Sequence, residues 1–183
     1  MVDVRHLPQQ AAHWSGPAAV RMALVIELGP AAPSQWRLAQ HEHLNTSPAA
    51  IDPVLVTATL NTLIQNCRYT STDVGAGPGP ADLTTFRTGL MSSIDDGRPI
   101  VAALRMHDNA PRPPGYPDRL DAIEHTVLVV AYADGGEIAR LADPASRGKG
   151  VEWADRVPPK YSLPTSTLLT LMAERGYVAA GSR

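Results

Sequence analysis

Apolar residues in the first half of the chain fall into segments with the length and end signals of helices. Residues 15–28 are apolar around nearly the whole helical circumference, with Pro17 in the first turn and Gly29-Pro30 as a stop. A helix with so few polar positions is expected to lie buried at the centre of the fold. Capping or proline residues begin three further predicted helices, at residues 35–43, 53–66 and 80–94.

The pattern changes after residue 97 to short apolar runs separated by turns. Residues 99–104 and 125–132 are continuous apolar stretches that predict buried strands. The turn sequence Asp134-Gly135-Gly136 predicts a hairpin that leads into a third strand at residues 137–142. Less regular patterns predict the remaining elements, which are strands at 68–74, 151–153 and 177–180 and a helix at 165–175.

The order of these elements favours an α+β fold. Helices come first and strands joined by short turns follow, so an antiparallel sheet is expected. The chain has 183 residues, which suits one domain better than two, and we expect a single domain over residues 1–183. An apolar fraction of 44% is sufficient for a buried core.

Charge and composition exclude several classes of partner. The formal net charge of −2 provides no basic field, which argues against nucleic-acid binding. The longest apolar runs are too short to span a bilayer, and no signal-peptide pattern begins the chain, so we expect no membrane association and a cytoplasmic location. The single cysteine, Cys67, excludes an internal disulfide and is expected to be a core or edge thiol. The sequence leaves the oligomeric state open.

Four polar residues occupy positions suited to nucleophilic catalysis. Ser15 opens the apolar helix, where the helix dipole favours a developing negative charge. His125 begins an apolar strand, and Asp143 ends the next strand after a tight hairpin, so pairing of the two strands brings the carboxylate close to the imidazole. Gln9 lies six residues before Ser15 and can supply a side-chain amide donor to an oxyanion.

Together these motifs resemble the papain-like cysteine peptidases, and most closely the C39-like peptidase group. That group has a Gln six residues before a Cys in a Trp-Cys-Gly-Pro-Ala-like motif, then a Gly-x-Pro-Ile/Val-Val strand, a His that starts an apolar strand, and an Asp-Pro. The matching segments here are Gln9, Trp14-Ser15-Gly16-Pro17-Ala18-Ala19, Gly97-Arg98-Pro99-Ile100-Val101, His125 to Tyr132, and Asp143-Pro144.

The resemblance implies a papain-like α+β fold, in which a helical N-terminal part with a central nucleophile helix packs on a C-terminal antiparallel sheet. It implies cleavage or transfer of a peptide or related amide through an acyl-enzyme intermediate. By motif, Gln9 would be the oxyanion amide, Ser15 the nucleophile, His125 the base and Asp143 its orienting partner. No cofactor is expected.

The serine at position 15 departs from the cysteine of that group. A hydroxyl ionises far less readily than a thiol, so the same geometry should lose several orders of magnitude in rate. Three interpretations remain open. Ser15 is an inactivating replacement of cysteine, which we favour, or the mark of a natural pseudopeptidase that binds peptides, or a working nucleophile in a modified site.

Further residues are assigned to substrate binding or excluded from metal binding. Four substrate-binding candidates lie beside the candidate nucleophile or base: His13, Trp14, Gly16 and Glu124. The fifth, Tyr116, lies on a proline-rich insertion at residues 107–122 that is expected to overhang the cleft. Packing beside the helix is a competing interpretation of Trp14. No metal site is expected, because His41 and His43 are two residues apart on a predicted helix and point in different directions.

Overall fold

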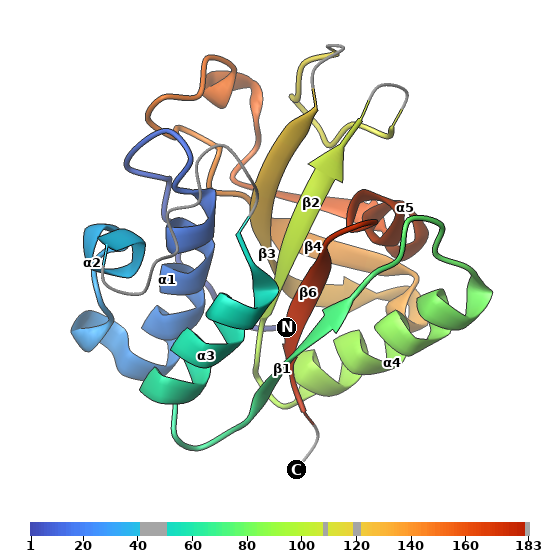
Figure 1. Ribbon diagram of the computed structural model, residues 1–183, viewed down its shortest axis with the longest axis horizontal. Coiled ribbons are helices and arrows are strands. Elements are labelled where there is room, and N and C mark those ends of the chain that lie inside the picture. Colours follow the sequence, from blue (N-terminus) through green and yellow to red (C-terminus); the bar gives the residue numbers. More distant parts are fainter. Residues whose placement is uncertain (41–50, 108–109, 119–121, 182–183) are drawn as a thin grey trace.

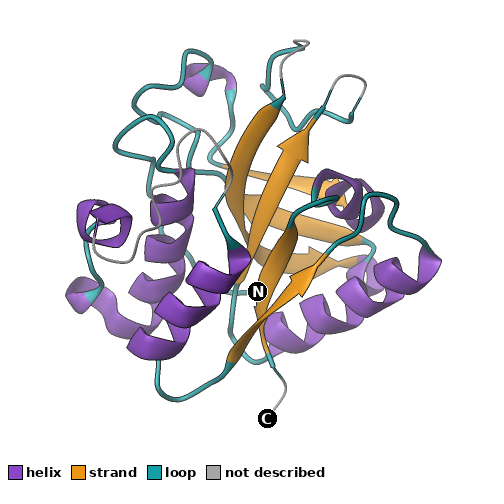
Figure 2. Ribbon diagram, in the orientation of Figure 1, coloured by secondary structure: helices purple, strands orange, loops and turns teal. Residues whose placement is uncertain are grey.

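A twisted antiparallel sheet runs through the centre of the molecule, with helices on both of its faces (Figures 1 and 2). The structure, a computed structural model, describes residues 1–40, 51–107, 110–118 and 122–181. The sheet has six strands in the order β1-β6-β2-β3-β4-β5. Their bounds are β1 Tyr69–Asp73, β2 Ile100–Met106, β3 Ile123–Ala133, β4 Ile138–Ala142, β5 Lys160–Pro164 and β6 Gly176–Ala180.

The helices divide between the two faces of this sheet. The helices are α1 Ser15–Leu28, α2 Gln35–Gln40, α3 Pro53–Leu63, α4 Pro80–Asp95 and α5 Thr165–Leu171, with short 3₁₀ turns η1 Gly29–Ala31, η2 Asp134–Gly136 and η3 Ala154–Arg156. Figure 1 shows α1 and α3 on one side of the strands and α4 and α5 on the other. The α+β architecture predicted from the order of elements is confirmed.

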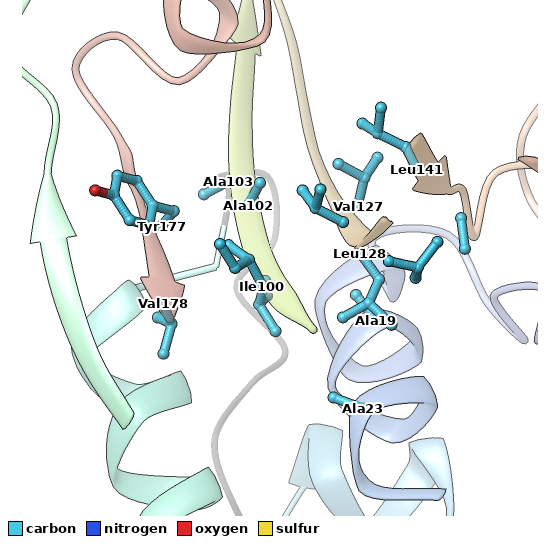
Figure 3. Close-up of a cluster of buried hydrophobic side chains, with 14 of the residues drawn as sticks. Ala19, Ala23, Ile100, Ala102, Ala103, Val127, Leu128, Leu141, Tyr177 and Val178 are labelled. Atoms are coloured by element: carbon cyan, nitrogen blue, oxygen red, sulfur yellow. The ribbon is translucent and has the colours of Figure 1, made fainter. Parts of the chain in front are cut away.

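Small side chains allow α1 to approach the sheet closely. Ala19 and Ala23 are fully or almost fully buried, and Figure 3 shows them beside Leu128 of β3. In the same view Tyr177 and Val178 of β6 point to opposite sides of the sheet, as alternation along a strand requires. Tyr177 stacks edge-to-face on Phe86 of α4, with ring centroids 5.0 Å apart. The core is therefore two apolar layers, one on each face.

The strand that comes last in the chain, β6, lies inside the sheet, between the edge strand β1 and β2. β6 pairs with β1 through Tyr69↔Ala180 and neighbouring pairs, and with β2 through Val101↔Val178. β3 pairs on one side with β2 and on the other with β4, and its register shifts between Val129 and Ala131. These antiparallel pairings place Ala142, at the end of β4, opposite Leu128, three residues after His125 in β3, which matters for the site.

Several predicted boundaries need correction. The helix predicted over 53–66 ends at Leu63, because Asn61 turns its side chain to the backbone N–H and carbonyl of Tyr69 at the start of β1. The predicted strand at 151–153 is a turn before η3, and β5 forms later, against β4. The last helix ends at Leu171 rather than 175, and β3 begins two residues before His125. Residues 41–43 of the predicted helix 35–43 lie outside the described part of the chain.

Candidate active site

Ser15 is the first residue of α1, and its side chain is held against β3. The hydroxyl Oγ accepts a hydrogen bond from the backbone N–H of Thr126, with N and O 3.2 Å apart. The residue is 9% exposed. In the first turn of a helix the backbone N–H groups have no intrahelical acceptor. Pro17 has no N–H group, so the N–H groups of Ser15 and Gly16 are the donors at the N-terminal end of α1. The position combines a nucleophilic atom with an electropositive helix end.

His125 and Asp143 form a buried pair next to Ser15. The Nε2 atom of His125 donates to Oδ1 of Asp143 over 2.7 Å. His125 is 4% exposed and Asp143 is completely buried. Because Nε2 faces the carboxylate, Nδ1 is the ring nitrogen left to exchange a proton with a reacting group. The predicted closeness of the two residues is thus a feature of the fold.

Among the described residues, four groups donate hydrogen bonds to the side chain of Asp143. Besides His125, Oδ1 accepts from the N–H of Ala145 over 2.8 Å, and Oδ2 accepts from the hydroxyls of Tyr116 and Tyr161 over 2.9 and 2.8 Å. Burial alone would raise the pKa of Asp143, but the charge and hydrogen bond of His125, the Ala145 N–H and the Tyr161 hydroxyl outweigh it and lower the pKa. The carboxylate is therefore a fixed anion behind the imidazole.

This lowered pKa makes a prediction about acid stability. A carboxylate whose pKa is lower in the folded than in the unfolded chain adds stability above the unfolded value of about 3.9, and loses it as pH falls through the folded value. Asp143→Asn removes this contribution. We expect the free-energy difference of unfolding between native chain and variant, measured with urea, to be constant above about pH 5 and to shrink below about pH 4. A difference that stays constant down to pH 2 would contradict the ionised state.

Gln9 joins the segment before α1 to the loop that follows Asp143. Its backbone N–H donates to the carbonyl of Pro144, and its carbonyl accepts from the N–H of Lys149, both over 2.9 Å. The side chain is 3% exposed, and its Nε2 donates to the carbonyl of Ala11 over 2.9 Å. A primary amide has two N–H donors, so one remains beyond this bond. Position and chemistry suit an oxyanion donor.

Ser15, His125 and Gln9 line one cleft of about 250 Å³, which we call the Ser15 cleft. The remaining lining residues come from the turn before α1, the start of β3 and the loop before η3: Ala12, His13, Ile123, Glu124, Gly150, Val151, Glu152 and Trp153. The cleft therefore lies where the helix N-terminus, a central strand and the loop after Asp143 meet.

Comparison with family models identifies the family of the chain. The model described as Peptidase_C39 like family matches residues 1–160. The chain belongs to this family. The fold is accordingly papain-like, and the family indicates peptidase-type activity on a peptide substrate. A search of curated proteins found no matching sequence.

Two of the five residues predicted to bind substrate in this C39-like chain line the Ser15 cleft. His13 is exposed there, with a left-handed backbone angle φ of 63°. Glu124 also lines the cleft, but its carboxylate is held by Arg175, whose Nε donates over 2.7 Å, and by Arg105 at 3.2 Å. His13 is thus available to a ligand, and Glu124 is largely neutralised.

The other three are not among the residues that line the Ser15 cleft. Trp14 lines a neighbouring cavity rather than the Ser15 cleft. Tyr116 does not overhang the cleft: it is buried, with its hydroxyl on Asp143 and its ring 4.3 Å from that of Trp153. Gly16 is buried against Ile51, and a Cβ atom at Gly16 would lie 2.5 Å from Ile51 Cδ1. Burial of the aromatic ring decides the position of Tyr116, and close helix packing decides that of Gly16.

The contact at Gly16 predicts a specific loss of stability. Gly16→Ala forces Ile51 to move, and overpacking of a filled core typically costs about 1–3 kcal/mol. We expect a loss in that range from urea unfolding, and we expect Ile51→Val in the same chain to recover part of it. A Gly16→Ala variant as stable as the native chain would show that Ile51 repacks freely.

The sequence offered little sign of some residues around the site. Tyr161 donates to Asp143 from β5, a strand that the pattern did not predict, because its alternation is short and interrupted by prolines. His6, in the extended N-terminal segment, donates through Nε2 to the backbone carbonyl of Asp143 over 2.8 Å. Glu152 and Trp153 enter the cleft from a turn. Only the fold brings these distant segments to one aspartate.

Within residues 1–40, 51–107, 110–118 and 122–181, no group of three His, Cys, Asp or Glu side chains is arranged to hold a metal ion. His41 and His43 fall outside those ranges. No helix in the described part of the chain has both the length and the apolar character needed to cross a bilayer.

Proposed function

We propose that this C39-like chain carries an amide-bond hydrolase or acyl-transfer site in which Ser15 occupies the nucleophile position. His125 acts as the base, Asp143 orients it, and Gln9 together with the Ser15 N–H binds the oxyanion. The observation that carries the proposal is the meeting of Ser15, Gln9 and the His125–Asp143 pair at one cleft. The 183 residues act as one domain, since β6, beyond the matched residues, completes the sheet between β1 and β2.

The proposed reaction follows acyl-transfer chemistry. The atom at position 15 attacks the scissile carbonyl carbon while its proton passes to Nδ1 of His125, and the carbonyl oxygen becomes an anion. Collapse of this intermediate breaks the C–N bond, and the imidazolium returns the proton to the departing amine. Water or a second amine then attacks the acyl-enzyme with the same proton relay, which frees position 15.

A hydroxyl at position 15 limits this reaction. The Thr126 N–H and the end of α1 favour negative charge on Oγ, but the neighbouring imidazole suits a thiol, which ionises far more readily. The site has an oxygen in place of sulfur at position 15 but retains Gln9, His125 and Asp143. This fits replacement of a cysteine by serine better than gradual evolutionary loss of the site, because gradual loss does not preserve the other catalytic residues. We therefore assign low or no turnover to the serine form.

A non-catalytic peptide-binding role is the second candidate. It is favoured by the state of Ser15 itself, whose hydroxyl is nearly buried and bonded to the backbone of β3. Such a protein would hold a peptide in the Ser15 cleft and release it unchanged. Cysteine at position 15 separates the two candidates: the catalytic one requires a reactive thiol and peptide cleavage, whereas the binding one requires neither.

A further inference from the structure

A second cavity, larger than the Ser15 cleft, lies on the other side of Gln9. It measures about 490 Å³ and is bounded by the segment before α1, by α1 and α2, and by the loop after Asp143. Its described lining residues include three cations and two indoles, and we call it the cationic groove, with the characteristic residues Gln9, Trp14, Arg21, Trp36, Arg147 and Lys149. No carboxylate is among its described lining residues.

Backbone hydrogen bonds fix the loop that carries two of these cations. The N–H of Lys149 donates to the carbonyl of Gln9 over 2.9 Å, and the N–H of Arg147 donates to the carbonyl of Ala154 over 3.2 Å. Gly148 lies so close to Gln9 that a Cβ atom would be 2.7 Å from Gln9 Cγ. The side chains of Arg147 and Lys149 are exposed, but the chain from which they extend is tied to the candidate oxyanion residue.

Arg21 adds a buried donor to the wall of this groove. It lies on α1, one and a half turns after Ser15, and its Nε atom is buried without a hydrogen-bond partner among the described residues. A buried guanidinium N–H without an acceptor is unfavourable, since it has lost water and gained nothing in return. An oxygen acceptor within the groove would satisfy it.

The two cavities that share Gln9 differ in charge. Glu152 brings a carboxylate to the Ser15 cleft, where Glu124 is already paired with Arg175 and Arg105, whereas the cationic groove carries only positive charge among its described residues. A peptide that crosses Gln9 would therefore meet a change from negative to positive surroundings. Such asymmetry selects the direction and the side chains of a bound chain.

We infer that the cationic groove binds an acidic segment of the peptide substrate, on the Gln9 side of the scissile bond. Asp or Glu carboxylates would pair with Arg21, Arg147 and Lys149, and the indole of Trp14 would cover the aliphatic part of the segment. This inference rests on the proposed function, because it takes the Ser15 cleft as the place of the scissile amide. It specifies the substrate class that the family alone leaves open.

Binding to the chain with Ser15 in place tests the inference without turnover. Three synthetic peptides of equal length, which differ only in a central pair of Glu, Gln or Lys, are titrated by isothermal titration calorimetry at low and at physiological salt. We expect the Glu peptide to bind about tenfold more tightly than the Gln peptide at low salt, with the advantage reduced by added salt. Binding of the Lys peptide should be the weakest.

Matched variants locate the effect. Arg147→Gln with Lys149→Gln removes two exposed cations from the groove, whereas Arg140→Gln with Lys160→Gln removes two exposed cations from β4 and β5 outside it. The first pair should abolish the preference for Glu over Gln, and the second should leave it unchanged. Equal loss in both pairs would reduce the effect to net charge and overturn the inference.

Other outcomes are equally decisive. Tighter binding of a single-stranded oligonucleotide of the same charge than of the Glu peptide would overturn the choice of occupant. No difference among the three peptides would overturn the groove's role, even if cysteine at position 15 proves reactive. Conversely, the preference for the Glu peptide could depend on Arg147 and Lys149 while a cysteine at position 15 is unreactive. That result would support binding of an acidic peptide in the groove and contradict the proposed hydrolase activity.

Discussion

Ser15→Cys is expected to convert this chain from a nearly inert protein into one with a reactive thiolate and measurable peptide cleavage. The new thiol lies at the end of α1, beside His125 and opposite the Thr126 N–H, and these surroundings lower a cysteine pKa. Against an acidic-segment peptide, we expect cleavage to rise by at least on the order of 10³-fold over the serine chain, because the nucleophile is the limiting part of an otherwise assembled site.

Thiol labelling gives the cleaner measurement of this change. With Cys67→Ser as background, iodoacetamide labelling of cysteine at position 15 is followed by mass spectrometry between pH 8 and pH 6. For a thiol with the ordinary pKa of about 8.5, the thiolate fraction falls roughly seventyfold between pH 8 and pH 6. For a thiol with a strongly lowered pKa, the thiolate fraction changes little over the same range. Ser71→Cys, on an exposed position of β1, is the matched control. A cysteine at position 15 that follows the control's pH profile would falsify the catalytic proposal.

His125→Ala has the second largest expected effect, measured in the chain that carries Ser15→Cys. Loss of the general base and of the charge that stabilises the thiolate should lower kcat/KM by on the order of 10³-fold. Labelling of the thiol at pH 6 should fall toward that of an ordinary cysteine. Imidazole added to the solution is expected to restore part of the cleavage, since the variant leaves a cavity beside Asp143.

A control separates this effect from damage to the fold. His125 is buried and is the partner of a buried carboxylate, so its removal also lowers the free energy of unfolding. Rates are therefore compared under conditions where urea unfolding shows both chains folded. His107→Ala, at an exposed histidine 3.6 Å from Glu174, removes an imidazole outside the site and should leave cleavage unchanged. Equal losses in the two histidine variants would reject the role of His125.

The central helix and the hairpin were predictable because their signals are local. The apolar stretch of residues 15–28 lies between a proline start and a Gly-Pro stop, and α1 has those bounds. The Asp-Gly-Gly turn joins β3 to β4, and antiparallel pairing from that turn brings Asp143 to His125. In such cases backbone preference and side-chain period over a few residues are enough.

The errors share a different physical cause. Residues 151–153 have a strand-like composition but no partner strand in the described part of the chain, where β5 pairs with the edge of β4. Tyr116 lies in a proline-rich loop that resembles a surface lid, yet Gly115, with φ of 82°, packs so closely on η3 that a Cβ atom would be 2.2 Å from the carbonyl oxygen of Arg156. Strand pairing decided the first case and burial decided the second, and both involve segments far apart in the chain.

The sequence by itself determined the helix that presents Ser15, the strands that bear His125 and Asp143, and the family motif that joins them. Only the tertiary structure decided what surrounds them: Tyr116 and Tyr161 on the carboxylate, and the cationic groove behind Gln9. The reason is that local periodicity fixes single elements, whereas hydrogen bonds to a buried charge and the charge of a cavity arise where several elements meet.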